Sequence, residues 1–93
     1  MKLVFADAAW DDYLYWQQQD RKILQRINKL IQETRREPFA GTGKPEALKH
    51  ALSGFWSRRI TDEHRMVYRV TDDAVVVVAV AHVHRRPRYW EGR

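Results

Sequence analysis

The chain of 93 residues contains no cysteine. A disulfide framework, a cysteine-ligated metal site and a cysteine nucleophile are therefore excluded, and nothing indicates an oxidising compartment. The sequence also lacks an apolar run long enough to span a membrane. It begins with Met1 and the short run "KLVF", with acidic residues soon after, which is the pattern of neither a signal peptide nor a transit peptide. We therefore expect a cytoplasmic protein with no membrane partner.

Glycine and proline are few, and they gather in the segment "PFAGTGKPEALKHALSG", residues 38–54, which we predict to be a loop. Its "GTGK" suggests a phosphate-binding loop. That motif requires a longer glycine-framed spacing and a Ser or Thr after the lysine, whereas Pro45 follows here and no strand-loop-helix context exists. Nucleotide binding is rejected, and Gly41 and Gly43 are interpreted as turn residues.

The composition is that of one folded domain over residues 1–93, with residues 85–93 as a short C-terminal extension. The net charge of +5 and the pI of about 9.9 favour an anionic partner. Residues 1–43 hold seven Lys and Arg against six Asp and Glu, and residues 44–93 hold ten against six, so the excess lies in the second half. Scattered basic residues also serve solubility, so net charge alone does not decide between the two interpretations.

The first half of the chain predicts a strand and two helices. Residues 2–5 form the strand, and Asp7 is the expected N-cap of a helix with Trp10, Tyr13, Leu14 and Gln17 on one face. Asp20 is the expected N-cap of a second helix that ends before Pro38. The apolar face of this second helix carries Ile23, Ile27, Leu30 and Ile31.

In the second half of the chain, from Phe55 onward, the residue pattern repeats every two residues, as in a β-strand. The runs "FWSRRI", "HRMVYRV" and "AVVVVAVAHV" are rich in β-branched and aromatic residues and are separated by "TDE" and "TDD". They predict an antiparallel meander whose last strand is covered on both sides. The expected fold is α+β in the order β-α-α-β-β-β, with two N-terminal helices on one face of a small twisted, mainly antiparallel sheet and the charged residues on the other.

Two arginines of this meander are expected to share a phosphate. If 61–63 is a three-residue loop, Arg59 lies opposite Arg65, and like charges placed this way destabilise a sheet unless an anion lies between them. Planar guanidinium groups suit phosphate oxygens. The alternative is that both side chains extend separately into solvent.

A carboxylate and two histidines complete a candidate site. Glu46 and Lys49 are predicted on one side of a short helical turn, where Glu46 can remove a proton from a ribose 2′-OH. A surface Glu–Lys pair is the alternative. A two-residue loop at 72–73 would place Val80 opposite Arg65, with His82 and His84 on the same face, and either histidine could protonate a leaving oxygen.

The stretches "WDDYLYWQ", "KPEALKH" and "LSGFWSRRITDEHRMVYRV" resemble the YoeB-type toxins of the RelE/ParE superfamily, from Met1 to about Asp73. The resemblance implies the toxin of a type II toxin–antitoxin pair with a RelE-like, microbial ribonuclease-like sheet. The implied activity is that of a ribosome-dependent mRNA endonuclease acting in the A site. Implied partners are the 30S ribosome with its mRNA, an acidic YefM-like antitoxin and a second copy of the chain.

The resemblance also assigns roles to residues. It implies that Glu46 is the general base, that Arg65 and Arg59 hold the scissile phosphate, and that Lys49 contacts phosphate, with Lys44 among the residues that bind RNA. It implies no metal and no cofactor.

The C-terminus departs from the family's pattern. The family ends in "Arg-Tyr-His-Tyr", with a catalytic histidine and a tyrosine that orients a base, whereas this chain ends in "AHVHRRPRYWEGR". Alignment places His84 on the catalytic histidine, with His82 as second choice, and Tyr89 or Trp90 is left to stack on a base. The tail resembles those of ParE-like toxins, whose target is DNA gyrase. Gyrase inhibition is therefore the alternative function, and a basic module without chemistry is a third.

Overall fold

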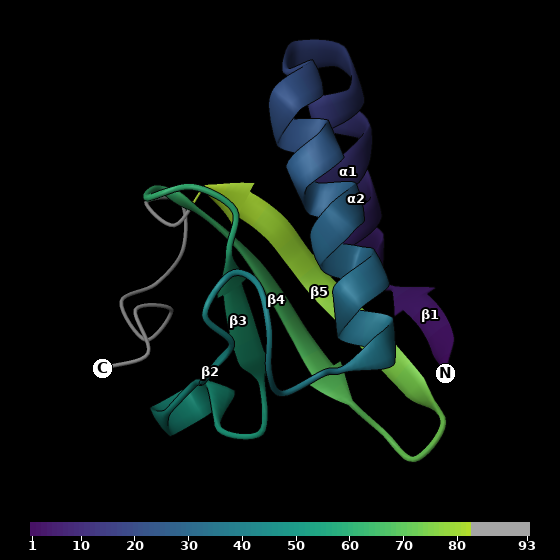
Figure 1. Ribbon diagram of the computed structural model, residues 1–93, viewed down its shortest axis with the longest axis vertical. Coiled ribbons are helices and arrows are strands. Elements are labelled where there is room, and N and C mark those ends of the chain that lie inside the picture. The colour runs from purple at the N-terminus through teal and green to yellow at the C-terminus, as the bar shows by residue number, and fades with distance from the viewer. Residues whose placement is uncertain (83–93) are drawn as a thin grey trace.

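A five-stranded sheet carries two helices on one face (Figure 1), and the computed structural model describes residues 1–82. The strand order is β1-β5-β4-β3-β2, with β1 parallel to β5 and the other pairs antiparallel. This confirms the predicted α+β fold. The elements are β1 (Lys2–Phe5), α1 (Asp7–Gln19), α2 (Arg21–Arg36), β2 (Glu46–Ala47), the 3₁₀ helix η1 (His50–Leu52), β3 (Trp56–Arg59), β4 (His64–Val70) and β5 (Ala74–His82).

The short strand β2 was not predicted. Glu46 lies opposite Ser57 and the backbone N–H of Leu48 donates to the carbonyl of Phe55 at 2.9 Å, so this segment pairs with the edge of β3. The expected helical turn at Glu46 and Lys49 is therefore wrong, because the backbone of Glu46 is extended and η1 begins only after Lys49. The pairing satisfies backbone groups that β3 would otherwise leave exposed at its edge.

Helix α1 buries a face that is offset from the predicted one. Ala9 and Trp16 are buried, whereas Trp10 and Leu14 are 47% and 41% exposed. The Trp16 indole N–H donates to the carbonyl of Val80 at 2.9 Å, which fixes α1 against β5. Its N-cap is Ala6, without a side-chain hydrogen bond, so the predicted cap at Asp7 is wrong.

Helix α2 follows the prediction closely. Its N-cap Asp20 accepts hydrogen bonds from the backbone N–H groups of Lys22 at 3.0 Å and Ile23 at 3.1 Å. Ile27 and Leu30 are fully buried, and the helix ends at Arg36, two residues before Pro38. The capped start and the apolar stripe together set the position of α2 on the sheet.

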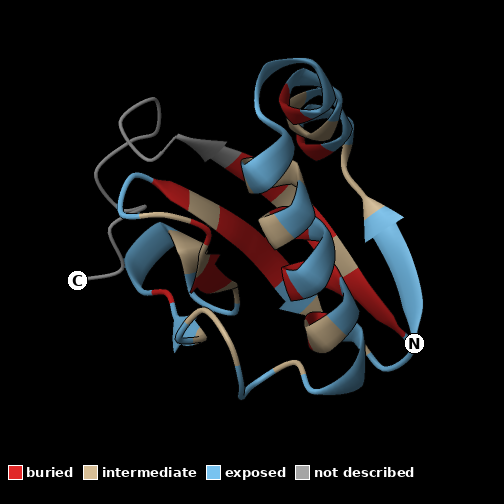
Figure 2. Ribbon diagram, turned by 45° about the horizontal axis from the view of Figure 1, so that its top comes forward, coloured by how far each residue is buried: buried red, intermediate tan, exposed pale blue. Residues whose placement is uncertain are grey.

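The core lies between the helices and the sheet, where Figure 2 shows the buried residues. Met66 and Tyr68 of β4 and Val75 and Val77 of β5 pack there, while β1 is mostly exposed. A second cluster of Leu48, Val67 and Ala79 lies on the other side of the sheet, and Leu52, Phe55 and Val78 pack against it. We call this side, turned away from α1 and α2, the open face.

A β-bulge changes the pairing of β4 with β5. Tyr68 lies opposite Val77 but Val67 lies opposite Ala79, so one extra residue is inserted in β5. Arg65 consequently lies opposite Ala81, and His82 lies opposite His64. The prediction that Val80 lies opposite Arg65 is wrong, and the register argument that placed His82 on the side of Arg65 fails with it.

A buried arginine organises the long connection between α2 and β2. Arg58 is fully buried, and its guanidinium donates to the carbonyls of Glu37 at 2.5 Å, Ala40 at 2.8 Å and Thr42 at 2.9 Å. Its Nε donates to the hydroxyl of Tyr68 at 3.3 Å. These four acceptors satisfy a charge that would otherwise be costly to bury.

Tyr68 joins the same network. Its hydroxyl donates to the carbonyl of Pro38 at 2.6 Å, and its ring centroid lies 6.0 Å from the guanidinium carbon of Arg58. Burial raises the pKa of Tyr68, so the hydroxyl remains protonated and available as a donor. We call the segment 37–43 that Arg58 and Tyr68 hold the anchored loop.

Gly43 ends the anchored loop where two layers of the fold meet. Its φ is +88°, and an added Cβ would lie 3.0 Å from Leu30 Cδ2, 3.1 Å from Arg58 Cβ and 3.2 Å from the Arg59 carbonyl oxygen. The Gly43 carbonyl accepts a hydrogen bond from the Arg59 N–H at 2.7 Å. Both backbone conformation and space therefore require glycine here.

Gly43→Ala should destabilise the protein by about 1–3 kcal/mol more than Gly54→Ala, because it adds overpacking to the backbone strain. Gly54 is the matched control, since its φ is +96° but nothing lies within 4 Å of an added Cβ. Urea unfolding of both variants measures the difference. Equal losses of the free energy of unfolding would contradict the close packing at Gly43.

Tyr68→Phe should lower the free energy of unfolding by about 1–2 kcal/mol, because it removes one donor and one acceptor from a buried network. Tyr15→Phe is the control, as Tyr15 is 47% exposed, and we expect a change within about 0.5 kcal/mol. Urea titration of both variants is the measurement. A Tyr68→Phe variant as stable as the control would mean that the network adds no stability.

Candidate active site

Arg59 and Arg65 lie directly opposite each other on neighbouring strands, as predicted. Two residues away, Ser57 lies opposite Val67, and Val67 belongs to the cluster on the open face. Since side chains two apart on a strand share a face, both arginines lie on the open face. Their Cβ atoms are expected to be about 4.5–5.5 Å apart, which allows one phosphate to contact both guanidinium groups.

The turn between β3 and β4 directs the Arg65 side chain. Arg65 Nη1 donates to the carbonyls of Thr61 at 2.6 Å, Asp62 at 3.1 Å and His64 at 3.1 Å. The Thr61 hydroxyl in turn accepts from the backbone N–H groups of Glu63 at 3.2 Å and His64 at 3.1 Å, which shapes the turn. The guanidinium is therefore oriented before any ligand arrives.

Glu46 is brought to the same face by β2. It lies opposite Ser57 and is therefore a diagonal neighbour of Arg59, at a separation of about 7–8 Å. Glu46 is exposed at this position. This face thus combines a carboxylate with two cations.

Lys44 and Lys49 flank β2 at exposed positions. Lys44 has a φ of +51° and follows Gly43 at the end of the anchored loop. Lys49 is the N-cap of η1. The structure therefore places both lysines in the segment that carries Glu46, and it assigns no contact that decides their predicted phosphate-binding roles.

The remaining predicted site residues lie at or beyond residue 82, the last residue that the structure describes. His82 is the last residue of β5, paired with His64. His84, Tyr89 and the extension 85–93 lie outside the described residues. Their roles remain predictions.

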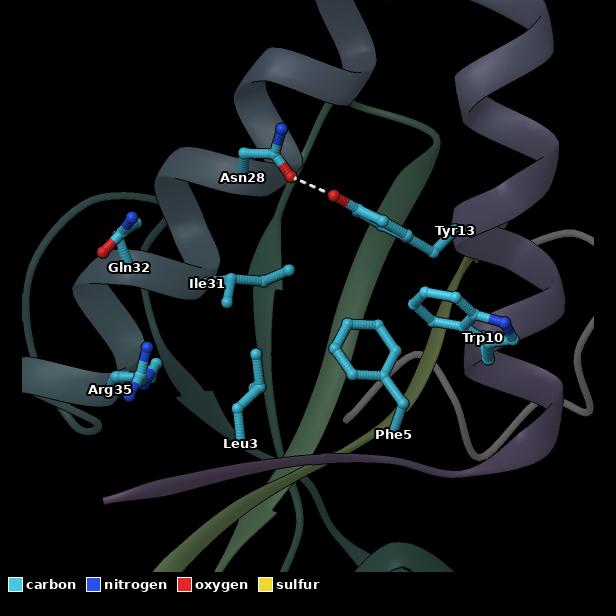
Figure 3. A pocket seen from close by; sticks show the side chains of 8 residues that line it. All are labelled: Leu3, Phe5, Trp10, Tyr13, Asn28, Ile31, Gln32 and Arg35. Atoms are coloured by element: carbon cyan, nitrogen blue, oxygen red, sulfur yellow. Dashed lines mark hydrogen bonds between the residues drawn. The ribbon is translucent and has the colours of Figure 1, made fainter.

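A separate pocket of about 480 Å³ lies between β1, α1 and α2 (Figure 3). It is lined by Leu3, Phe5, Trp10, Tyr13, Asn28, Ile31, Gln32 and Arg35. The Tyr13 hydroxyl donates to Asn28 Oδ1 at 2.6 Å across it. Within residues 1–82, no predicted site residue lines this pocket, and β1 is at the opposite edge of the sheet from β2. The candidate active site is therefore separate from this pocket.

Residues 1–82 contain neither a candidate metal-binding cluster nor a helix that could span a membrane. Those residues hold no group of three or more His, Asp and Glu side chains arranged to bind a metal ion. Neither α1 nor α2 combines the length and the apolar character needed to cross a membrane. The metal-independent chemistry suggested by the sequence remains a prediction.

The anchored loop that leads to the site is also held from α2. The Glu33 carboxylate accepts a hydrogen bond from the backbone N–H of Thr42 at 3.2 Å. Hydrogen bonds from the Thr42 side chain and backbone lower the pKa of Glu33. Glu33, Arg58 and Tyr68 thus fix the loop from three elements of the fold.

Comparison with known proteins gives one consistent result. A family model described as "YoeB-like toxin of bacterial type II toxin-antitoxin system" matches residues 5–84. Toxin YoeB of Escherichia coli strain K12 is 63% identical over 79 residues, which cover 85% of this chain and 94% of that protein. Two Staphylococcus aureus structures, a YoeB dimer and a heterotetrameric YoeB–YefM toxin–antitoxin complex, are each 40% identical with a TM-score of 0.82. Each comparison covers 88% of this chain and 95% of the other.

Glu33→Gln should destabilise the protein more at pH 7 than at pH 3. The folded-state pKa of Glu33 is lower than its usual value of 4.5, so its contribution is present above pH 4.5 and is lost as the pH falls through the folded-state pKa. Urea unfolding of wild type and variant at both pH values measures this difference. The same loss at pH 3 and pH 7 would mean that the charge on Glu33 does not hold the loop.

Proposed function

Because this chain belongs to the YoeB-like family of toxins of bacterial type II toxin–antitoxin systems, we propose that it is a ribosome-dependent mRNA endonuclease. It acts on mRNA in the A site of the 30S subunit and so blocks translation. The observation that carries the proposal is the placement of Glu46, Arg59 and Arg65 on one open face. The exposed Glu46 and the half-buried Arg59 and Arg65 suit a substrate that is presented by a much larger particle.

The chemistry follows from these side chains. Glu46 takes the proton of a ribose 2′-OH, and the 2′-oxygen forms a bond to the adjacent phosphorus. The bond from phosphorus to the 5′-oxygen breaks, which leaves a 2′,3′-cyclic phosphate and a 5′-hydroxyl end. Arg59 and Arg65, with Lys44 and Lys49, stabilise the negative charge that develops on the phosphate. No metal is needed for this step, because the nucleophile is part of the substrate.

The leaving oxygen requires a proton. His84 is the proposed donor, His82 is the second choice, and Tyr89 is proposed to stack on a base of the mRNA. These three assignments rest on the family resemblance and on the order of residues along the chain. The C-terminal sequence differs from the family's usual ending and resembles that of ParE-like toxins. Inhibition of DNA gyrase is therefore the alternative function to be tested.

The proposed protein partners follow from the relatives. The Staphylococcus aureus proteins form a YoeB dimer and a YoeB–YefM complex. We therefore propose that this chain forms a homodimer and is neutralised by an acidic YefM-like antitoxin. The net charge of +5 favours association with an acidic partner.

The test is to map mRNA 5′ ends on translating ribosomes incubated with the purified protein. Wild type should cut within or beside the A-site codon. Arg65→Ala should lower the cleavage rate by about 10²–10³-fold, because a fixed cation is lost from the transition state. Glu46→Gln should lower it by about 10²–10⁴-fold, because the general base is lost.

Arg69→Ala is the matched control, since Arg69 is an exposed arginine on the same strand as Arg65 but four residues away. It should cleave at close to the wild-type rate. Intact mRNA with wild type, together with loss of gyrase supercoiling activity, would replace this proposal with the ParE-like alternative.

A further inference from the structure

The site depends on a strand that is too short to position itself. β2 comprises two residues, and Glu46 is the first of them. A ladder of this length contributes little stability on its own, so the position of Glu46 must be fixed by the chain on either side. On the N-terminal side that chain is the anchored loop 37–43, followed by Lys44 and Pro45.

Arg58 is the side chain that holds the anchored loop at several points. Its guanidinium reaches the carbonyls of Glu37, Ala40 and Thr42, and the last of these lies four residues before Glu46. Such spacing leaves little freedom to the segment between Thr42 and β2. The main chain of the next residue adds a further bond, from the Arg59 N–H to the Gly43 carbonyl at 2.7 Å.

Arg58 and Arg59 are neighbours on β3, so their side chains lie on opposite faces of the sheet. Arg58 lies opposite Met66 of the main core, and Arg59 lies opposite Arg65 on the open face. The short strand β3 therefore both holds the anchored loop, which leads to Glu46, and carries Arg59, the cation proposed to contact the phosphate. Any movement of the loop relative to β3 changes the separation of Glu46 from Arg59.

We propose that Arg58 is a positioning residue that acts through the anchored loop to set Glu46 relative to Arg59 and Arg65. This inference rests on the proposed nuclease function. Lysine cannot replace Arg58 in this role, because a single ammonium group does not present the planar set of N–H donors that serves three carbonyls and a hydroxyl. Catalytic groups displaced by about 1 Å lose about 10²-fold in rate, so the loop need not unfold for activity to fall.

The test is a double-mutant cycle with Arg58→Lys and Glu46→Gln, measured as single-turnover cleavage of mRNA on saturating ribosomes. Arg58→Lys should lower the maximal rate about 10- to 100-fold and leave the half-saturating ribosome concentration nearly unchanged. The double variant should be no slower than Glu46→Gln alone, because Arg58 acts through Glu46. Multiplicative effects of the two changes, or a wild-type rate for Arg58→Lys, would overturn the inference.

Arg35→Lys is the control for replacing an arginine that binds a carbonyl. Arg35 donates to the Met1 carbonyl at 3.3 Å, remote from β3, and its variant should cleave at the wild-type rate. A variant that merely unfolds is recognised by amide hydrogen exchange. In Arg58→Lys, amides 40–48 should exchange faster while those of α2 and β4 keep their protection.

The same exchange measurement separates the two hypotheses. If wild type leaves mRNA intact, the nuclease function fails. Faster exchange at 40–48 in Arg58→Lys would then still support the anchoring of the loop by Arg58. Unchanged exchange at 40–48 overturns the inference whatever wild type does to mRNA.

Discussion

The buried guanidinium of Arg58 and three carbonyl groups of the anchored loop are each other's hydrogen-bond partners. A positive charge taken out of water costs several kcal/mol unless hydrogen bonds replace its hydration, and here three carbonyls and the Tyr68 hydroxyl do so. The irregular loop likewise needs partners for its own polar groups. Neither is stable in this place without the other. The path of the chain from α2 to β2 follows from this mutual dependence.

This dependence links the inside of the fold to its surface. Inside, Arg58 and Tyr68 hold the loop against the core; outside, Arg59 and Arg65 lie side by side with Glu46 one strand away. Placing two cations opposite each other opposes folding, and a phosphate between them removes the repulsion. In the proposed reaction, this arrangement presents two cations to the charge of the transition state. The stability of the core therefore supports the chemistry proposed for the open face.

Local signals in the sequence predicted the helices, the cap at Asp20 and the pairing of Arg59 with Arg65, because each depends on residues close together in the chain. The β-bulge was missed, since residues 74–81 of β5 are all apolar and show no alternation that an inserted residue could interrupt. Strand β2 was missed because two residues carry no periodicity. The contacts of Arg58 with the anchored loop were also missed, because three of its four acceptors are backbone carbonyls, which no residue type reveals.

In the proposed mechanism, the cations and the carboxylate of the open face promote attack by the substrate's own 2′-OH. The most direct measurement uses ribosomes programmed with an mRNA that carries a single 2′-deoxynucleotide at the cleavage position in the A-site codon. This mRNA should stay intact while the all-ribose mRNA is cut to a 2′,3′-cyclic phosphate. Cleavage of the 2′-deoxy mRNA at the same bond would contradict this mechanism, because the nucleophile would then have to come from elsewhere.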